Sequence, residues 1–218
     1  MTRGAVLVSG DGGQLQAIID SIYFNELPDF ELVAVISTSR EAYAMKRAAS
    51  ANVPAFVVDP ELFPTGTSHS IAVATKLKDM DIDLVILADY SMPLGVISYQ
   101  FKGQIIGSMP ALYPAFENFE GDIIAETVRR GLKISGATTY LLDPDGYVGD
   151  IIYQKALDIL PSDTEETLRR RIMEDCIWKI LPDSVRLYCT EHSKKEEPAP
   201  APPKNYPGSN KGNGRRNR

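Results

Sequence analysis

The stretch VLVSGDGGQLQAIID, residues 6–20, decides the fold of this chain. An apolar run over residues 5–8 is typical of a buried strand, and apolar side chains at helical spacing predict a helix over residues 15–24. The turn between them is Ser9-Gly10-Asp11-Gly12-Gly13. Such a turn can bind phosphate, because its backbone approaches the anion closely and the first N–H groups of the helix point at it.

This turn is not one of the well-known nucleotide motifs. It lacks the third glycine of the dinucleotide fingerprint and the lysine of a Walker loop. On spacing alone, a plain tight turn between strand and helix therefore remains the alternative.

Strands and helices alternate after this block. In the first half, strands are predicted over residues 30–36, 54–58 and 84–88, and helices over residues 41–51 and 68–80. Alternation of this kind is typical of parallel strands covered by helices on both faces. The second half predicts a short strand over 104–108, a helix over 121–130, a hairpin of strands 135–142 and 150–157, and an amphipathic helix over 164–180.

The composition, 44% hydrophobic and 24% charged, is ordinary for a soluble globular protein. Residues 1–190 are expected to form one domain, and residues 191–218 a disordered, Pro/Gly-rich basic tail. No apolar stretch reaches the roughly 18 residues that a membrane helix needs. A cytoplasmic location is expected, with the two distant cysteines buried or reduced.

The formal net charge of −6 is unevenly distributed. Residues 193–218 carry seven Lys or Arg against two Glu, which leaves −11 on residues 1–192. An acidic body repels nucleic acid, so any such contact would go through the basic tail. The alternative for the tail is a solubilising end without a partner.

Residues 6–20 resemble the opening of the glycinamide ribonucleotide formyltransferases, where Ser-Gly-x-Gly-Ser-Asn-Leu-Gln-Ala-Ile holds the substrate phosphate. The similarity extends over residues 4–187, with matching blocks at 33–58, 81–94, 110–114 and 169–175. The resemblance implies a Rossmann-like, three-layer α/β fold with a mixed, mostly parallel sheet of about seven strands. It also implies transfer of a formyl group from 10-formyltetrahydrofolate to a primary amine, with no metal.

Two catalytic residues of the resembled family belong to an Asn-x-His-Pro-Ser-Leu-Leu-Pro motif. The matching stretch here is GSMPALYP, residues 107–114, so Gly107 takes the place of the asparagine and Met109 that of the histidine. Neither side chain can donate a hydrogen bond to an oxyanion or move a proton. The chain has two histidines, His69 and His192, and both are interpreted as solvated surface residues.

The third catalytic residue of the family is an aspartate. Ungapped alignment places Tyr147 there, whereas a shift of two residues would place Asp145 there. Asp145 and Asp150 are therefore candidates for a substitute carboxylate. The alternative is that these acids only form a turn.

The resemblance also implies substrate and cofactor contacts. Gly13 stands where the family has a hydroxyl residue and Gln14 where it has an asparagine; Asp89 replaces a glycine, and Met92 stands where an arginine is common. Tyr90 is interpreted either as an aromatic wall or as a core residue. The implied folate contacts are Asp89, Tyr90, Ser91 and Met92; the substrate contacts are Ser9, Gly10, Asp11, Gly12, Gly13, Gln14 and, after a short gap, Glu174.

Two functional hypotheses follow. The first is a formyltransferase-like protein with impaired catalysis that binds a phosphorylated metabolite, a protein partner or a second copy of itself. The second is an active folate-dependent transferase, acting on glycinamide ribonucleotide or an amino sugar nucleotide with rebuilt catalytic residues.

Overall fold

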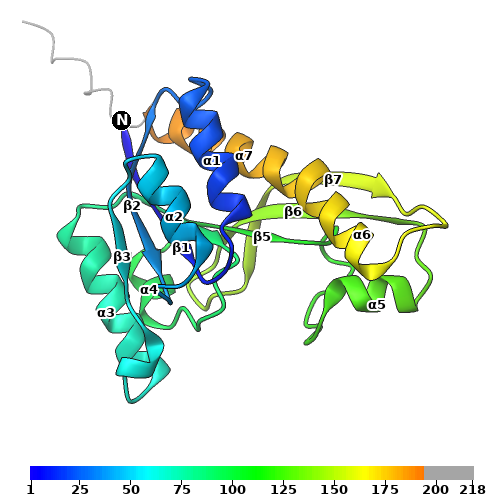
Figure 1. The fold of residues 1–218 in the computed structure, drawn as a ribbon, viewed down its shortest axis with the longest axis horizontal. Helices are drawn as coiled ribbons and strands as arrows, with labels where there is room; N and C mark the ends of the chain where they lie inside the picture. The colour runs from blue at the N-terminus through cyan, green and yellow to red at the C-terminus, as the bar shows by residue number, and fades with distance from the viewer. Residues whose placement is uncertain (194–218) are drawn as a thin grey trace, which may run out of the picture.

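The computed structural model describes residues 1–193, which form one seven-stranded sheet with helices on both faces (Figure 1). The strands are β1 (Thr2–Val8), β2 (Phe30–Ser37), β3 (Ala55–Val57), β4 (Leu84–Ala88), β5 (Ile105–Met109), β6 (Ile134–Leu142) and β7 (Val148–Asp158). The helices are α1 (Gly13–Tyr23), α2 (Tyr43–Ser50), α3 (Gly66–Asp79), α4 (Val96–Gln100), α5 (Ile123–Arg129), α6 (Glu165–Arg171) and α7 (Trp178–Ser193). A 3₁₀ turn, η1 (Pro60–Leu62), and a π-helical segment, η2 (Ile172–Ile177), complete the elements.

The strand order is β3-β2-β1-β4-β5-β6-β7. The first five strands are parallel, and β6 and β7 are antiparallel to their neighbours. The predicted mixed, mostly parallel sheet is therefore confirmed. The order reverses between β1 and β4, and in open α/β sheets a ligand crevice forms at the carboxyl ends of the strands beside such a reversal.

Two apolar clusters hold the layers together. On one face, α1, α2, α5, η2 and α7 pack on the sheet, and on the other face α3 and α4 do so. The strands are apolar on both faces because both are covered: residues 5–8 and 84–86 are fully buried.

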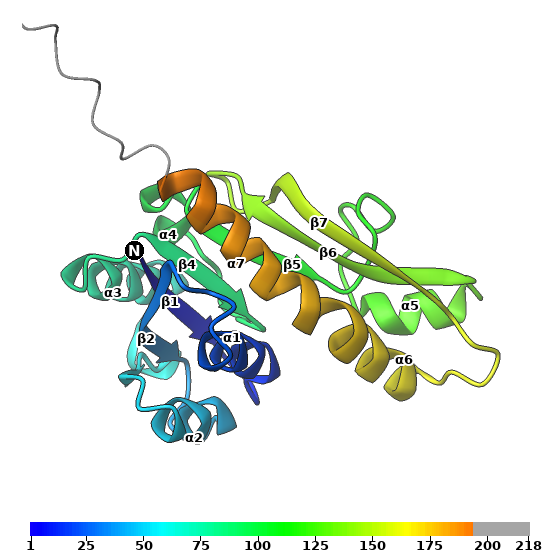
Figure 2. The same cartoon turned by 90° about the horizontal axis from the view of Figure 1, so that it is seen from above.

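The C-terminal helix is longer than the sequence predicts. The expected helix over 164–180 continues as α6, η2 and α7 to Ser193, passing through Pro182 (Figure 2). A proline inside a helix costs about 3 kcal/mol. Ile180, Leu181 and Val185 are buried around it, and this packing outweighs the local penalty.

The remaining elements differ little from the prediction. The short helix α4 and the 3₁₀ turn η1 were not expected, because neither has enough residues to display a periodicity. The tail predicted for residues 191–218 lies outside the described residues from position 194 onward.

Candidate functional site

The candidate site lies where β1, β4 and β5 end. The loop after β1 and the loop after β4 are joined by a hydrogen bond of 3.0 Å, in which the Ser91 N–H donates to Ser9 Oγ. The segments predicted to contact phosphate and folate therefore lie beside each other, at the edge where the strand order reverses.

A chain of side-chain hydrogen bonds crosses this edge. Ser108 Oγ donates to Gln14 Oε1 at 3.1 Å, and Gln14 Nε2 donates to Asp89 Oδ1 at 2.8 Å. Gln14 is only 2% exposed, in the first turn of α1. Its amide thereby fixes the ends of β4 and β5 relative to α1.

Both the backbone conformation and the ionised carboxylate of Asp89 are energetically unfavourable. Its backbone has φ +54°, in the left-handed region that favours glycine. Asp89 is exposed as a residue, but desolvation of its carboxyl group raises the pKa, and the nearby Asp11 charge raises it further. The hydrogen bond from Gln14 opposes these effects only in part.

The glycine-rich loop is occupied by groups of the protein itself. Gly12, at φ +77°, turns the chain into α1, and the Gly13 N–H donates to Asp11 Oδ1 at 3.0 Å. A Cβ on Gly13 would lie 2.8 Å from Cζ2 of Trp178. The indole ring therefore packs on the start of α1, where the family carries a hydroxyl side chain.

Trp178 also forms one wall of a cleft of about 540 Å³. The loop after β1, the ends of β4 and β5, and the α6–α7 region line this cleft together. The lining residues are Asp11, Gly13, Gln14, Asp89, Ser108, Pro110, Glu166, Arg169, Arg170, Met173, Glu174, Ile177 and Trp178. The structure thus brings together Asp11, Gly13, Gln14, Asp89 and Glu174 of the predicted residues.

The position predicted for the catalytic asparagine is filled by a neighbour. Gly107 is paired with Tyr140 across β5 and β6. A Cβ on Gly107 would lie 2.8 Å from Cε2 of Tyr140 and 2.9 Å from Cδ1 of Leu142. Burial raises the pKa of the Tyr140 hydroxyl, so the phenol stays protonated at neutral pH and cannot serve as a base.

Met109, at the predicted histidine position, lines a separate pocket of about 330 Å³ with Tyr113, Asp143 and Tyr147. Asp143 Oδ1 accepts the backbone N–H groups of Asp145 and Tyr147, which is ordinary turn chemistry.

The two proposed substitute carboxylates are surface residues. Asp145 is exposed in the β6–β7 turn and Asp150 is exposed on β7. Neither is among the residues that line the pocket beside Met109 or the cleft beside Trp178.

The folate segment is divided between core and surface. Tyr90 packs on the second apolar cluster, and the burial of its hydroxyl raises the pKa. Ser91 is exposed, and Met92 is half-buried. Of the two interpretations offered for Tyr90, the structure supports core packing.

The surface interpretation is wrong for His69. This residue is 1% exposed, its Nε2 lies 2.9 Å from the Val58 carbonyl oxygen, and its ring meets Phe63 edge-to-face. His192 is half-buried and stacks on Tyr188. Neither histidine lines the cleft or the pocket beside Met109.

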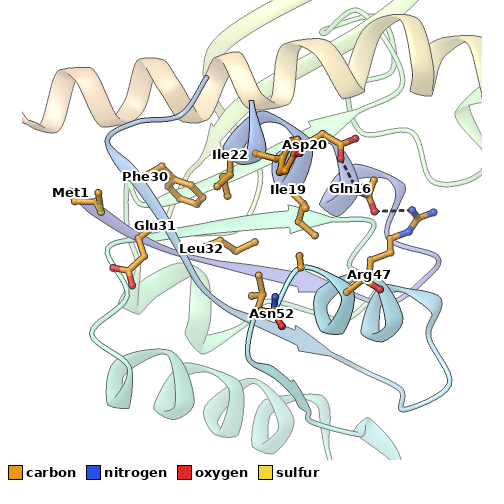
Figure 3. Close-up of a pocket in the computed structure, with 14 residues that line it drawn as sticks. Met1, Gln16, Ile19, Asp20, Ile22, Phe30, Glu31, Leu32, Arg47 and Asn52 are labelled. Carbon is orange, nitrogen blue, oxygen red and sulfur yellow. Dashed lines mark hydrogen bonds between the residues drawn. The ribbon is translucent and has the colours of Figure 1, made fainter. Parts of the chain in front are cut away.

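A third cavity, about 580 Å³ in volume, lies between α1 and α2 (Figure 3). Apolar side chains such as Ile19, Ile22 and Leu32 line it, and Arg47 donates to Gln16 at its rim. None of the residues predicted to act on or bind a ligand lines this cavity. Its size alone does not make it the functional site.

Three residues of the site were missed from the sequence: Ser108, Tyr140 and Trp178. The available signal was a pair of glycines, Gly13 and Gly107, at positions where the family carries functional side chains. A missing side chain in a packed fold indicates that another group fills the space.

The sheet, the glycine-rich loop and the crevice at the strand reversal define an α/β protein of the doubly wound class. A family model described as formyl transferase matches residues 2–185. The chain therefore belongs to the formyl transferase family.

Individual relatives agree with this assignment. The phosphoribosylglycinamide formyltransferase of Bacillus subtilis is 30% identical over 173 residues, covering 79% of this chain and 87% of that protein. The trifunctional purine biosynthetic protein adenosine-3 of Drosophila pseudoobscura is 34% identical over 172 residues, which are 78% of this chain but only 12% of that protein. Glycinamide ribonucleotide transformylase 1 of Symbiobacterium toebii superimposes with a TM-score of 0.82 at 35% identity, covering 88% of this chain and 89% of that structure.

Two kinds of feature are absent from residues 1–193. No cluster of three or more His, Cys, Asp or Glu in this range could hold a metal ion. No helix in the same range is long and apolar enough to cross a membrane.

Proposed function

We propose that this chain is a formyl transferase family member that does not transfer formyl groups at the rates of active relatives, and that it binds a small molecule in the cleft beside Trp178. One observation carries the proposal. Gly107 and Met109 stand at the asparagine and histidine positions, and the Tyr140 ring fills the space in which an asparagine side chain would lie.

The chemistry of formyl transfer supports this reading. An amine attacks the formyl carbon, the developing oxyanion needs a hydrogen-bond donor, and a proton must reach the leaving nitrogen. A thioether and a glycine hydrogen perform neither task. Loss of each group costs on the order of 10² to 10⁴ in rate.

The surrounding carboxylates do not replace this machinery. Asp143 is engaged by two backbone N–H groups, and Asp145 and Asp150 are exposed and do not line the pocket beside Met109. The alternative of an active transferase with one of these acids as base therefore receives no support from their positions.

The family cofactor, 10-formyltetrahydrofolate, also fits poorly. Tyr90 and Tyr140 both pack on the second apolar cluster, and Met92 offers no charge to an anionic folate tail.

Turnover with glycinamide ribonucleotide and 10-formyltetrahydrofolate tests the proposal. The Bacillus subtilis relative, assayed in parallel, is the positive control. We expect kcat/KM of this chain to be lower by at least about 10⁴, from the loss of two groups. Turnover within about tenfold of the relative would contradict the proposal; in that event, loss of activity in Asp145→Asn/Asp150→Asn would establish the alternative.

A further inference from the structure

We infer that the cleft beside Trp178 selects a non-phosphorylated ligand that carries a protonated amine, and that Trp178 and Asp89 set this selectivity. The inference rests on the proposed function, since it treats the cleft as a binding site and assigns it a ligand class. A phosphate-binding loop at this position would favour an anion, whereas the cleft described here favours a cation.

Trp178 blocks the approach of an anion to the start of α1. The indole lies so close to Gly13 that even a Cβ there would meet Cζ2 at 2.8 Å. A phosphate at this loop would have to lie next to the first N–H groups of the helix. The Trp178 ring covers part of the surface from which a phosphate would reach these N–H groups.

The helix geometry explains how Trp178 comes to lie there. It directly follows η2, in which hydrogen bonds run from residue i to i+5. Such a turn holds an extra residue and rotates everything after it about the helix axis. The resemblance needs a short gap near Glu174, inside this same segment. The π-helical segment therefore sets the direction in which Trp178 leaves the helix.

The loop's own donor is also used internally. The Gly13 N–H is bonded to Asp11 Oδ1 at 3.0 Å, and this carboxylate brings a negative charge to the place where a phosphate would lie. The Asp11 carboxylate would repel a phosphate bound beside it, and this repulsion is strong where bulk water is excluded. An anion would have to displace Asp11 and Trp178 together.

The charges that line the cleft favour a cation. Four carboxylates line it, from Asp11, Asp89, Glu166 and Glu174, against two guanidinium groups. Arg169 forms an ion pair with Asp122, which lies outside the lining, so carboxylates still outnumber guanidinium groups around the cleft. A cleft lined mainly by one sign of charge concentrates ligands of the opposite sign.

Two further groups suit an amine in particular. Trp178 is 36% exposed, and indole is the aromatic side chain that attracts cations most strongly. The buried Gln14 amide holds Asp89 Oδ1, which fixes the carboxylate at the cleft for a charge-assisted hydrogen bond. A compact ammonium group therefore has both an acceptor and an aromatic face.

Calorimetric titration of the full chain with agmatine, an aliphatic cation with amine and guanidinium groups, tests the inference. We expect measurable binding by the wild type and at least about tenfold weaker binding by Asp89→Asn. Glu41→Gln makes the same charge change at an exposed residue outside the cleft and should bind like the wild type. No agmatine binding, or equal weakening by both variants, would overturn the inference.

A second titration uses inorganic phosphate. The wild type should not bind it, whereas the double variant Asp11→Asn/Trp178→Ala should bind it at least about tenfold more tightly than any residual wild-type affinity. Trp178 is partly exposed, so we expect the variant to fold, and a thermal melt checks this. Tight phosphate binding by the wild type would contradict the inference.

The binding results are separable from the turnover assay. Agmatine binding together with efficient formyl transfer would refute the proposed function but keep the ligand class. Absent turnover with phosphate binding in place of agmatine binding would keep the proposed function and refute the ligand class.

Discussion

The two sides of β5 have diverged in different ways. Ser108 lies on the side of the cleft, where it continues a polar network through the buried Gln14 to Asp89. Met109, the next residue, lines the other pocket, and Gly107 leaves room for the Tyr140 ring on the same face of the strand. Because successive strand residues point to opposite faces, one short strand serves both sides. The contacts on each side of β5 can therefore be altered separately.

The largest loss of stability is expected when a side chain is added at Gly107. We expect Gly107→Ala to lower the free energy of unfolding by about 1–3 kcal/mol, because the new methyl group meets Tyr140 and Leu142 inside van der Waals distance. Urea denaturation measures the change.

Gly10→Ala is the matched control for this substitution. A Cβ there meets nothing within 4 Å, so its effect should stay within about 0.5 kcal/mol. Equal stability of the two variants would mean that Tyr140 does not fill the space beside Gly107.

The polar side should respond to loss of its central amide. Gln14→Met keeps the volume but removes both hydrogen bonds, and we expect a loss of about 1–2 kcal/mol. Gln16→Met is the control, because Gln16 lies two residues further on α1 and bonds to Asp20 and Arg47 at the surface. Equal losses would show that the Ser108–Gln14–Asp89 hydrogen bonds contribute no more to the free energy of unfolding than those of Gln16 do.

The smallest effect concerns Asp89 and pH. Desolvation and the Asp11 charge raise its pKa in the folded state, so the folded protein binds this proton more readily than the unfolded chain does. Stability should therefore fall as pH rises through the folded-state pKa. Asp89→Asn removes this penalty, and its melting temperature should exceed that of the wild type at pH 7.

The difference between Asp89→Asn and the wild type should shrink as the pH approaches the unfolded value of 3.8. Thermal melts across this range measure it. An advantage of the variant that does not change with pH would place the cause in the backbone at φ +54°.

Much of the fold was accessible from the sequence because it rests on local patterns. The run over residues 5–8, the glycine turn and the helical spacing after it predicted β1, the loop and α1. The end of the last helix was not predicted, because burial of Leu181 and Val185 overrides Pro182 only in the folded protein.

The site was only partly accessible for the same reason. The motif frame identified Gly107 and Met109 as residues without the needed chemistry. What fills the space beside each glycine depends on contacts between segments far apart in the sequence. Tyr140 packs on Gly107 from the neighbouring strand β6, and Trp178 packs on Gly13 from the start of α7. His69 was misjudged because its carbonyl partner, Val58, is provided by the tertiary fold.

Formyl transfer by the unmodified protein is the measurement that bears most directly on these conclusions. With saturating ribonucleotide and formyl-folate, the product should form at least about four orders of magnitude more slowly than with the Bacillus subtilis protein. Product formation at a rate comparable to that protein would contradict the view that Gly107, Met109 and Tyr140 leave the site without catalytic machinery.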